Sequence, residues 1–285
     1  MLVDKNHAAI RQDLTLAYKH ITHGDKRPTV VVFPGGPGME YALYETHTDY
    51  IEPYADLLYF DPAGCGDSST MPADYEYTIQ DYVYNVKALI DYLAIDKVII
   101  LGTSFGGMAA LHFALYYPQR CQSLILVATA ASYHFLDTAQ YWVKTTNNIT
   151  DEQRQLCRDL FNGAFQDKTH LQRFLQASAS LYAYTPDNSP YAHFNCAVEP
   201  LNYMFRKRYQ YFDLTAQLPN INVPTLILAG ADDWIIHPQY PRTIAQSIPN
   251  TELHILEHCS HAVAKDRPEV YWDKVPRFTK QQSLN

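Results

Sequence analysis

Short apolar runs recur along the chain, and turn residues bound each of them. They lie at 29–33, 57–60, 98–101, 124–128, 225–229 and 251–256. Continuous apolar runs of this length favour strands that are buried on both faces of a parallel sheet. Residues 14–20 instead alternate between apolar and polar positions. This pattern predicts an antiparallel strand at the edge of the sheet, ahead of the others.

Helical patterns separate these runs, at 79–93, 104–117, 239–247 and 268–278. Alternating strands and helices predict βαβ units, and therefore an α/β fold with a mostly parallel sheet flanked by helices. The alternation stops between residues 131 and 213, where only helical patterns occur. Thr150 and Gln153 predict a capping box there, and the segment 187–190 predicts a loop. We expect a core of residues 1–130 and 214–285, with an inserted helical cap at 131–213.

The amino-acid composition limits the kinds of partner that we expect this protein to bind. Of the 285 residues 47% are hydrophobic and 18% charged, which is an ordinary globular balance. The net charge of −8 argues against nucleic acid, and no stretch has the length of a membrane span. The start of the chain lacks the apolar core of a signal peptide. Five scattered cysteines are typical of reduced thiols, so we expect a cytoplasmic protein without membrane contact.

The strongest chemical signal is Gly102-Thr-Ser104-Phe105-Gly106-Gly107, which follows one predicted strand and precedes a helix. This is G-x-S-x-G in the strand–turn–helix context of a nucleophilic serine, and it indicates the α/β-hydrolase fold. Glycines on both sides of Ser104 leave room for a sharp turn. An incidental serine in a glycine-rich turn is the alternative. A dinucleotide-binding turn fits less well, because the G-x-G-x-x-G spacing is missing.

Acyl transfer also needs hydrogen-bond donors aimed at the oxyanion. The loop Pro34-Gly35-Gly36-Pro37-Gly38 follows the run at 29–33 and offers backbone N–H groups without obstructing side chains. We expect one donor from Phe105 and a second from Gly35 or Gly36. A plain turn after a strand is the competing interpretation.

The order of a catalytic triad in this fold is serine, then an acid, then histidine. Asp232 and Asp233 follow the run at 225–229, and we favour Asp233 as the acid. His261 follows the last predicted strand and is our expected general base, with His258 as the alternative; His254 would lie within the strand. These histidines do not have the helical spacing common in zinc sites, so we expect no metal and no cofactor.

With these motifs in place, the chain resembles the prolyl aminopeptidase (proline iminopeptidase) family of α/β-hydrolases over nearly its whole length. The matching segments are PGGPG (34–38), FDPAGCGDS (60–68), GTSFGG (102–107), GADDWI (230–235) and CSHAV (259–263). The resemblance implies Gly36 as the loop donor and supports Asp233 as the acid. Two departures stand out. Pro34 replaces the family's His, and Pro62-Ala63 replace its Gln-Arg.

The same resemblance implies an aminopeptidase that recognises a free ammonium group through glutamates of the cap. Glu199 is the counterpart in this chain, although a glutamate beside Pro200 is also typical of the first turn of a helix. Tyr182, Tyr184, Phe194 and Tyr203 are candidates for the pocket wall. The sequence therefore predicts a serine hydrolase of small amides or esters, most simply a peptidase that releases the first residue of short peptides. A carboxylesterase or lactonase is the rival, and a non-catalytic binding protein is the third hypothesis.

Overall fold

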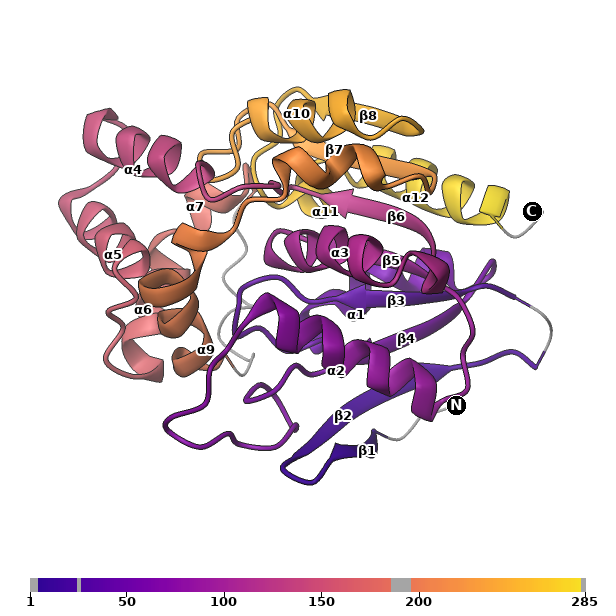
Figure 1. The fold of residues 1–285 in the computed structure, drawn as a ribbon. Coiled ribbons are helices and arrows are strands. Elements are labelled where there is room, and N and C mark those ends of the chain that lie inside the picture. The colour runs from indigo at the N-terminus through magenta and orange to yellow at the C-terminus, as the bar shows by residue number, and fades with distance from the viewer. Residues whose placement is uncertain (1–4, 25–26, 186–195, 283–285) are drawn as a thin grey trace.

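The computed structural model describes residues 5–24, 27–185 and 196–282. Within these ranges the chain forms one eight-stranded sheet in the order β1-β2-β4-β3-β5-β6-β7-β8 (Figure 1). The first two pairings, β1 with β2 and β2 with β4, are antiparallel, and the others are parallel. The predicted α/β class with a mostly parallel sheet is confirmed. The strands are β1 (Asn6–Arg11), β2 (Leu14–Ile21), β3 (Thr29–Phe33), β4 (Asp56–Phe60), β5 (Val98–Thr103), β6 (Cys121–Val127), β7 (Thr225–Gly230) and β8 (Thr251–Leu256).

Helices cover both faces of the sheet (Figure 1). On one face lie α2 (Ile79–Tyr92), α3 (Phe105–Tyr116) and α10 (Gln239–Ser247). On the other lie α1 (Ala42–Thr48), α11 (Val263–Asp266) and α12 (Pro268–Gln282). In β3, Val31 and Phe33 belong to the first core layer, while Val30 and Val32 belong to the second. Burial on both faces explains why the central strands are continuous apolar runs.

The strand at 14–20 was predicted at the edge of the sheet, and this is wrong. β1 lies outside β2, so β2 is an internal strand. β1 contains two alanines, only one of which is buried, and its polar residues give no strand signal. The helix predicted to start at Ser104 starts at Phe105, because Ser104 has a positive φ that no helix accepts.

An inserted helical region separates β6 from β7 (Figure 1). Ser132 and Asp213 form an antiparallel bridge, so the region leaves and re-enters the core at one place. We retain 131–213 as the proposed limits of the cap. Its elements in the described ranges are α4 (Phe135–Thr145), α5 (Asp151–Phe161), α6 (Lys168–Ala177), α7 (Ala179–Tyr182), α9 (Val198–Tyr203), η3 (Met204–Arg208) and η4 (Tyr209–Tyr211). Short helices also lie in the core, namely η1 (Asp49–Ile51) and η2 (Pro118–Arg120), and η5 (Thr215–Asn220) follows the cap.

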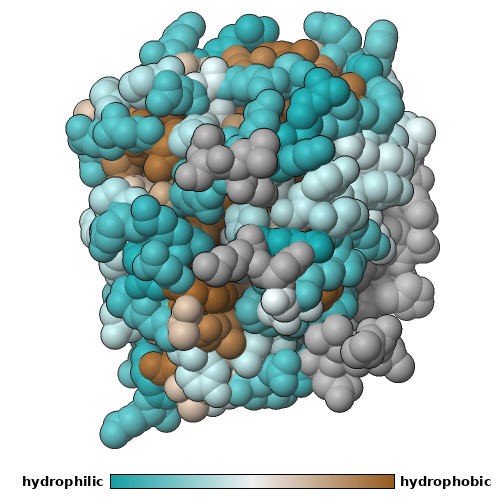
Figure 2. Space-filling view, turned by 90° about the vertical axis from the view of Figure 1, so that its right-hand side faces the viewer, coloured by the Kyte–Doolittle hydropathy of each residue, from teal (hydrophilic) through white to brown (hydrophobic). Residues whose placement is uncertain are grey.

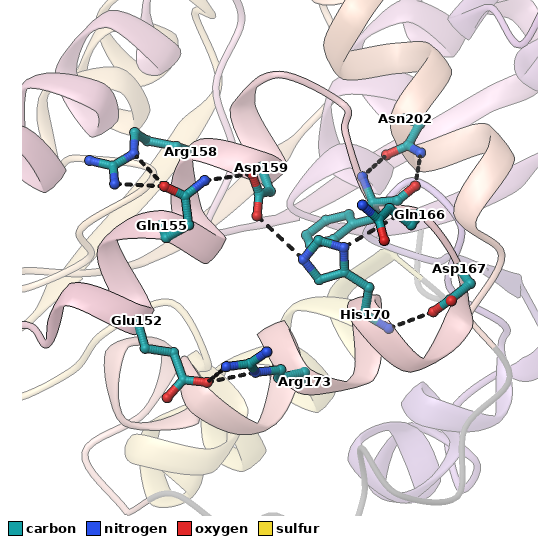
Figure 3. A network of polar contacts seen from close by, with 10 residues as sticks. Glu152, Gln155, Arg158, Asp159, Gln166, Asp167, His170, Arg173 and Asn202 are labelled. Atoms are coloured by element: carbon teal, nitrogen blue, oxygen red, sulfur yellow. Dashed lines mark hydrogen bonds and ion pairs between the residues drawn. The ribbon is translucent and has the colours of Figure 1, made fainter.

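Polar contacts hold the cap helices to one another (Figure 3). The side chain of Asn202 in α9 accepts from the Phe165 N–H at 3.1 Å and donates to the Phe165 carbonyl at 2.7 Å. Asp159 of α5 faces His170 of α6 at 3.3 Å. The predicted capping box at Thr150 is confirmed. The predicted loop at 187–190 and the aromatic Phe194 lie outside the described residues.

The face of the molecule opposite the cap is mostly hydrophilic, with hydrophobic residues in small separate patches (Figure 2). None of the helices in the described ranges has the length and apolar character needed to cross a bilayer. The five cysteines are free and buried.

One buried group gives stability a pH dependence. His112 of α3 is 5% exposed, and it stacks on Tyr116 with ring centroids 4.3 Å apart. Neither ring nitrogen has a hydrogen-bond partner among the described residues. Burial therefore lowers the pKa of His112 to about 4, from an ordinary value of 6.5.

We predict that the folded protein loses about 2 kcal/mol of stability between about pH 7 and about pH 5 through this group. Over this window the unfolded chain protonates His112 and the folded chain does not, so acid favours unfolding. Urea unfolding at both pH values, with His112→Leu as the comparison, measures the effect. An equal loss of stability in wild type and variant would show that His112 is not its source.

Candidate active site

Ser104 occupies a strained turn between β5 and α3, with φ 55° and ψ −118°. Its N–H donates to the Val127 carbonyl at 2.8 Å. Its own carbonyl accepts the Gly107 N–H at 2.9 Å and the Thr129 hydroxyl at 2.7 Å. Strain of this kind persists only where surrounding contacts hold it in place, and it is typical of functional sites.

The two flanking glycines make this turn possible, as their spacing predicts. A Cβ on Gly102 would lie 2.4 Å from the Gly106 carbonyl oxygen, and one on Gly106 would lie 2.1 Å from that of Phe33. Both distances are far inside van der Waals contact, and both obstacles are backbone. The close approach of β3, β5 and α3 therefore requires glycine at both positions.

His261 and Asp233 meet at the same edge of the sheet, from the loops after β8 and β7. His261 Nδ1 lies 2.7 Å from Asp233 Oδ2. The other carboxylate oxygen of Asp233 accepts the N–H groups of Ile235 and Ile236 at 3.0 and 2.9 Å. Asp233 is 2% exposed and His261 is 9% exposed. Because a carboxylate only accepts, the proton of His261 lies on Nδ1, and Nε2 keeps its lone pair.

The alternative acid and bases lie elsewhere. Asp232 accepts the hydroxyl hydrogen of Tyr184 at 2.9 Å on the surface. His254 lies 2.6 Å from Glu252, and His258 packs edge-on against Tyr184. Within the described ranges, no three His, Cys, Asp or Glu residues are arranged to hold a metal ion.

Two backbone donors belong to segments at the nucleophile, because Phe105 directly follows Ser104 and Gly36 lines the same cavity as Ser104. The N–H groups of Gly36 and Phe105 have no acceptor among the described residues. The Gly35 N–H, in contrast, donates to the Tyr44 hydroxyl at 2.8 Å. Of the two loop glycines that the sequence left open, Gly36 therefore has the available donor. Unpaired N–H groups beside a nucleophile are suited to hold an oxyanion.

Ser104 and His261 line one cavity of about 650 Å³. The structure has no direct hydrogen bond between these two described side chains. In unliganded enzymes this contact is often long, and it tightens around substrate. Gly36 also lines the cavity, so nucleophile, base and one oxyanion donor share a single wall.

The cavity wall contains two chemically different groups of side chains. The cap contributes an apolar group, namely Leu160, Leu171, Phe174, Leu175, Leu201 and Phe205. The core contributes polar side chains, Tyr44 and His47 of α1 and Lys265 of α11. None of the described residues that line the cavity is an aspartate or a glutamate. The space can therefore accept a substrate that has both apolar and polar parts.

The structure does not bring Glu199 to this cavity. Glu199 is exposed in the first turn of α9, whereas the cavity wall includes its neighbour Leu201. Among the candidate aromatic residues, Tyr182 lines the cavity. Tyr184 is exposed, and Tyr203 packs against Tyr77. The amine-binding role of Glu199 remains a prediction.

Sequence reasoning missed the residues of α1 and α11. Tyr44 and His47 lie one helical turn apart, so they project from the same face of a helix. This spacing, directly after the glycine-rich loop, is the only sequence signal for Tyr44 and His47. The seven residues of α1 are too few to show a clear helical period. Lys265 follows His261 by four positions. This indicates that Lys265 is close to the site but does not say in which direction its side chain points.

Known proteins of similar sequence and structure share this fold. A model of the α/β-hydrolase fold family matches residues 28–268. A proline iminopeptidase of Lactobacillus helveticus is 28% identical over 273 residues, which cover 89% of this chain and 90% of that protein. Proline iminopeptidase PfmaB of Pestalotiopsis fici is 29% identical over 274 residues, or 91% and 94% of the two chains. The crystal structure of proline iminopeptidase from Mycobacterium smegmatis superposes with a TM-score of 0.77 at 22% identity, over 99% of both chains.

Proposed function

This chain belongs to the α/β-hydrolase fold family, and from that premise we propose that it is a serine hydrolase of small esters or amides that works through an acyl-enzyme. The observation that carries the proposal is the shared cavity. The strained Ser104, His261 and Gly36 line it, while Asp233 pairs with His261 and Phe105 directly follows Ser104.

In the proposed mechanism the Ser104 hydroxyl attacks the substrate carbonyl while His261 Nε2 accepts its proton. Asp233 holds the imidazole through Nδ1 and stabilises the imidazolium that forms. The N–H groups of Gly36 and Phe105 bind the oxyanion, and each is worth about 3 kcal/mol in the transition state. His261 then protonates the leaving group and activates water to release the acyl group. Only residues of this chain are required.

The cavity wall favours a substrate with a sizeable apolar group. Six cap side chains provide an apolar surface next to the reacting centre. Burial of such a group contributes about 25 cal/mol per Å² of apolar surface removed from water. A free ammonium group would gain no carboxylate partner from the described wall, which argues for an ester or amide without one.

A prolyl aminopeptidase activity is the second candidate, because several similar proteins are named proline iminopeptidases. It would release the first residue of short peptides. It requires a carboxylate near the substrate amine, and Glu199 is the candidate from the sequence. In this case Glu199→Gln would reduce turnover of an aminoacyl arylamide.

A substrate panel tests the two activities. We expect nitrophenyl esters of apolar acids to be cleaved faster than proline nitroanilide, and N-acetylation of the nitroanilide to leave its slow rate unchanged. Initial rates of wild type and Glu199→Gln measure both. If the nitroanilide is the better substrate, and acetylation or Glu199→Gln abolishes its turnover, the protein is an aminopeptidase.

We further propose that the protein works in a reducing compartment such as the cytoplasm. The support is chemical, since all five cysteines are free and buried and free thiols are the usual state there.

A further inference from the structure

Hydrogen bonds join the cap to the loop that carries His261 (residues 257–262, the catalytic loop), on both sides of the histidine. Directly before it, the Ser260 hydroxyl donates to the Leu181 carbonyl at 2.7 Å. Directly after it, the Ala262 N–H donates to the Tyr182 carbonyl at 2.8 Å. Both acceptors lie at the end of α7, where a helix leaves its carbonyl groups unpaired. This short cap helix is therefore bonded to both neighbours of the proposed general base.

Asp266 adds a further link, because its carboxylate binds both segments. One oxygen accepts the Ser260 N–H of the catalytic loop, and the other accepts the Tyr184 N–H of the cap, both at 2.8 Å. Asp266 is half-buried at the end of α11, five positions after His261. Hydrogen bonds to a carboxylate are stronger than those between neutral groups. One side chain thus fixes the spacing between the cap and the catalytic loop.

The ring of Tyr182 extends this contact to the imidazole. It meets His261 edge-on, with ring centroids 5.4 Å apart and 79° between the ring planes. It also meets Trp234 at 5.6 Å, and Trp234 directly follows Asp233. Tyr182 therefore packs against residues of both triad loops, so the orientation of the imidazole depends on where α7 lies.

We propose that Asp266 is a positioning residue for the general base. By bonding to the cap and to the catalytic loop at once, it holds the His261 imidazole where Nε2 can accept the Ser104 proton. This inference rests on the proposed function, because it takes Ser104 and His261 as the reacting pair. Asp266 is not among the described residues that line the cavity, so it acts through His261 and not through the substrate.

Steady-state kinetics on the best nitrophenyl ester of the panel tests this role. Asp266→Ala removes both acceptors and should lower kcat about 10- to 100-fold, with KM within about twofold of wild type, because a small misplacement of a catalytic group is costly. Asp266→Asn keeps one acceptor, so its kcat should lie between the two. Asp273→Ala is the matched control, since Asp273 pairs with Arg277 on the exposed side of α12 at 2.8 Å, and its kcat should stay within about twofold.

A double-substitution cycle shows whether Asp266 acts through the imidazole. In His261→Ala the base is gone, so adding Asp266→Ala should change the residual rate by less than about twofold. The NMR signal of the His261 Nδ1 proton, identified by its loss in His261→Ala, gives a readout without turnover. We expect Asp273→Ala to retain this signal and Asp266→Ala to broaden or lose it, because the hydrogen bond to Asp233 requires a fixed ring.

An unchanged kcat in Asp266→Ala would overturn the proposal. A change confined to KM would do the same, as would an equal loss of rate in the wild-type and His261→Ala backgrounds. If thermal unfolding shows that Asp266→Ala does not fold, Asp266→Asn decides, and wild-type kcat with an unaltered Nδ1 signal rejects the role. Fluorophosphonate labelling tests Ser104 alone. An unlabelled wild-type protein would therefore reject the hydrolase proposal, whereas the NMR signal would still decide whether Asp266 holds His261.

Discussion

Replacing Ser104 with alanine should lower kcat by about 10³- to 10⁶-fold on the best ester of the panel and abolish labelling by a fluorophosphonate. The Ser104 hydroxyl is the proposed nucleophile. The neighbouring Thr103 also lines the cavity, but it belongs to β5 and lacks the strained turn, so we do not expect it to replace Ser104. Ser247→Ala is the control, because that hydroxyl only donates to the Thr243 carbonyl in α10. Labelling that persists in Ser104→Ala would reject this nucleophile. No labelling of the wild type would favour the non-catalytic hypothesis.

A second substitution at this position separates chemistry from folding. Ser104→Gly should be as inactive as Ser104→Ala but more stable by about 1 kcal/mol or more, because glycine accepts a positive φ without strain. Urea unfolding of the two variants measures the difference. Equal stabilities would mean that the turn stores no strain.

The sequence predicted the central strands well, because burial on both faces leaves a simple apolar signature. The limits of β3 and β8 match the predicted ones. The turn at Ser104 was also predictable, since backbone obstacles 2.4 and 2.1 Å away permit only glycine at 102 and 106. In both cases the residue type is dictated by contacts that any member of the fold must make.

The substrate end of the site was not predictable in the same way. The choice between Gly35 and Gly36 depends on the Tyr44 hydroxyl, which occupies one of the two N–H groups. The exposure of Glu199 depends on how α9 is oriented by Asn202 and its neighbours. Such tertiary contacts leave no periodic pattern, so a chain can reveal its reaction class more readily than its substrate.

The second large expected effect on kcat distinguishes the adjacent aspartates Asp232 and Asp233 as the acid of the triad. Asp233→Asn should lower kcat about 10³- to 10⁴-fold, whereas Asp232→Asn should stay within about twofold of wild type. The two positions are neighbours in one loop, but Asp233 meets His261 and Asp232 meets Tyr184. Steady-state kinetics on the best ester, with thermal unfolding of each variant, makes the comparison.

The reason is the proton on His261. Asparagine at 233 can keep one oxygen for the N–H groups of Ile235 and Ile236, so the loop should stay folded. Its amide nitrogen would then face Nδ1 and donate to it, which moves the imidazole proton to Nε2. A protonated Nε2 cannot accept the hydrogen of Ser104. Asparagine at 232 still accepts the Tyr184 hydroxyl, and nothing at the catalytic centre changes. A large loss with Asp232→Asn and a small one with Asp233→Asn would reverse the assignment, and two small losses would mean that the acid lies elsewhere.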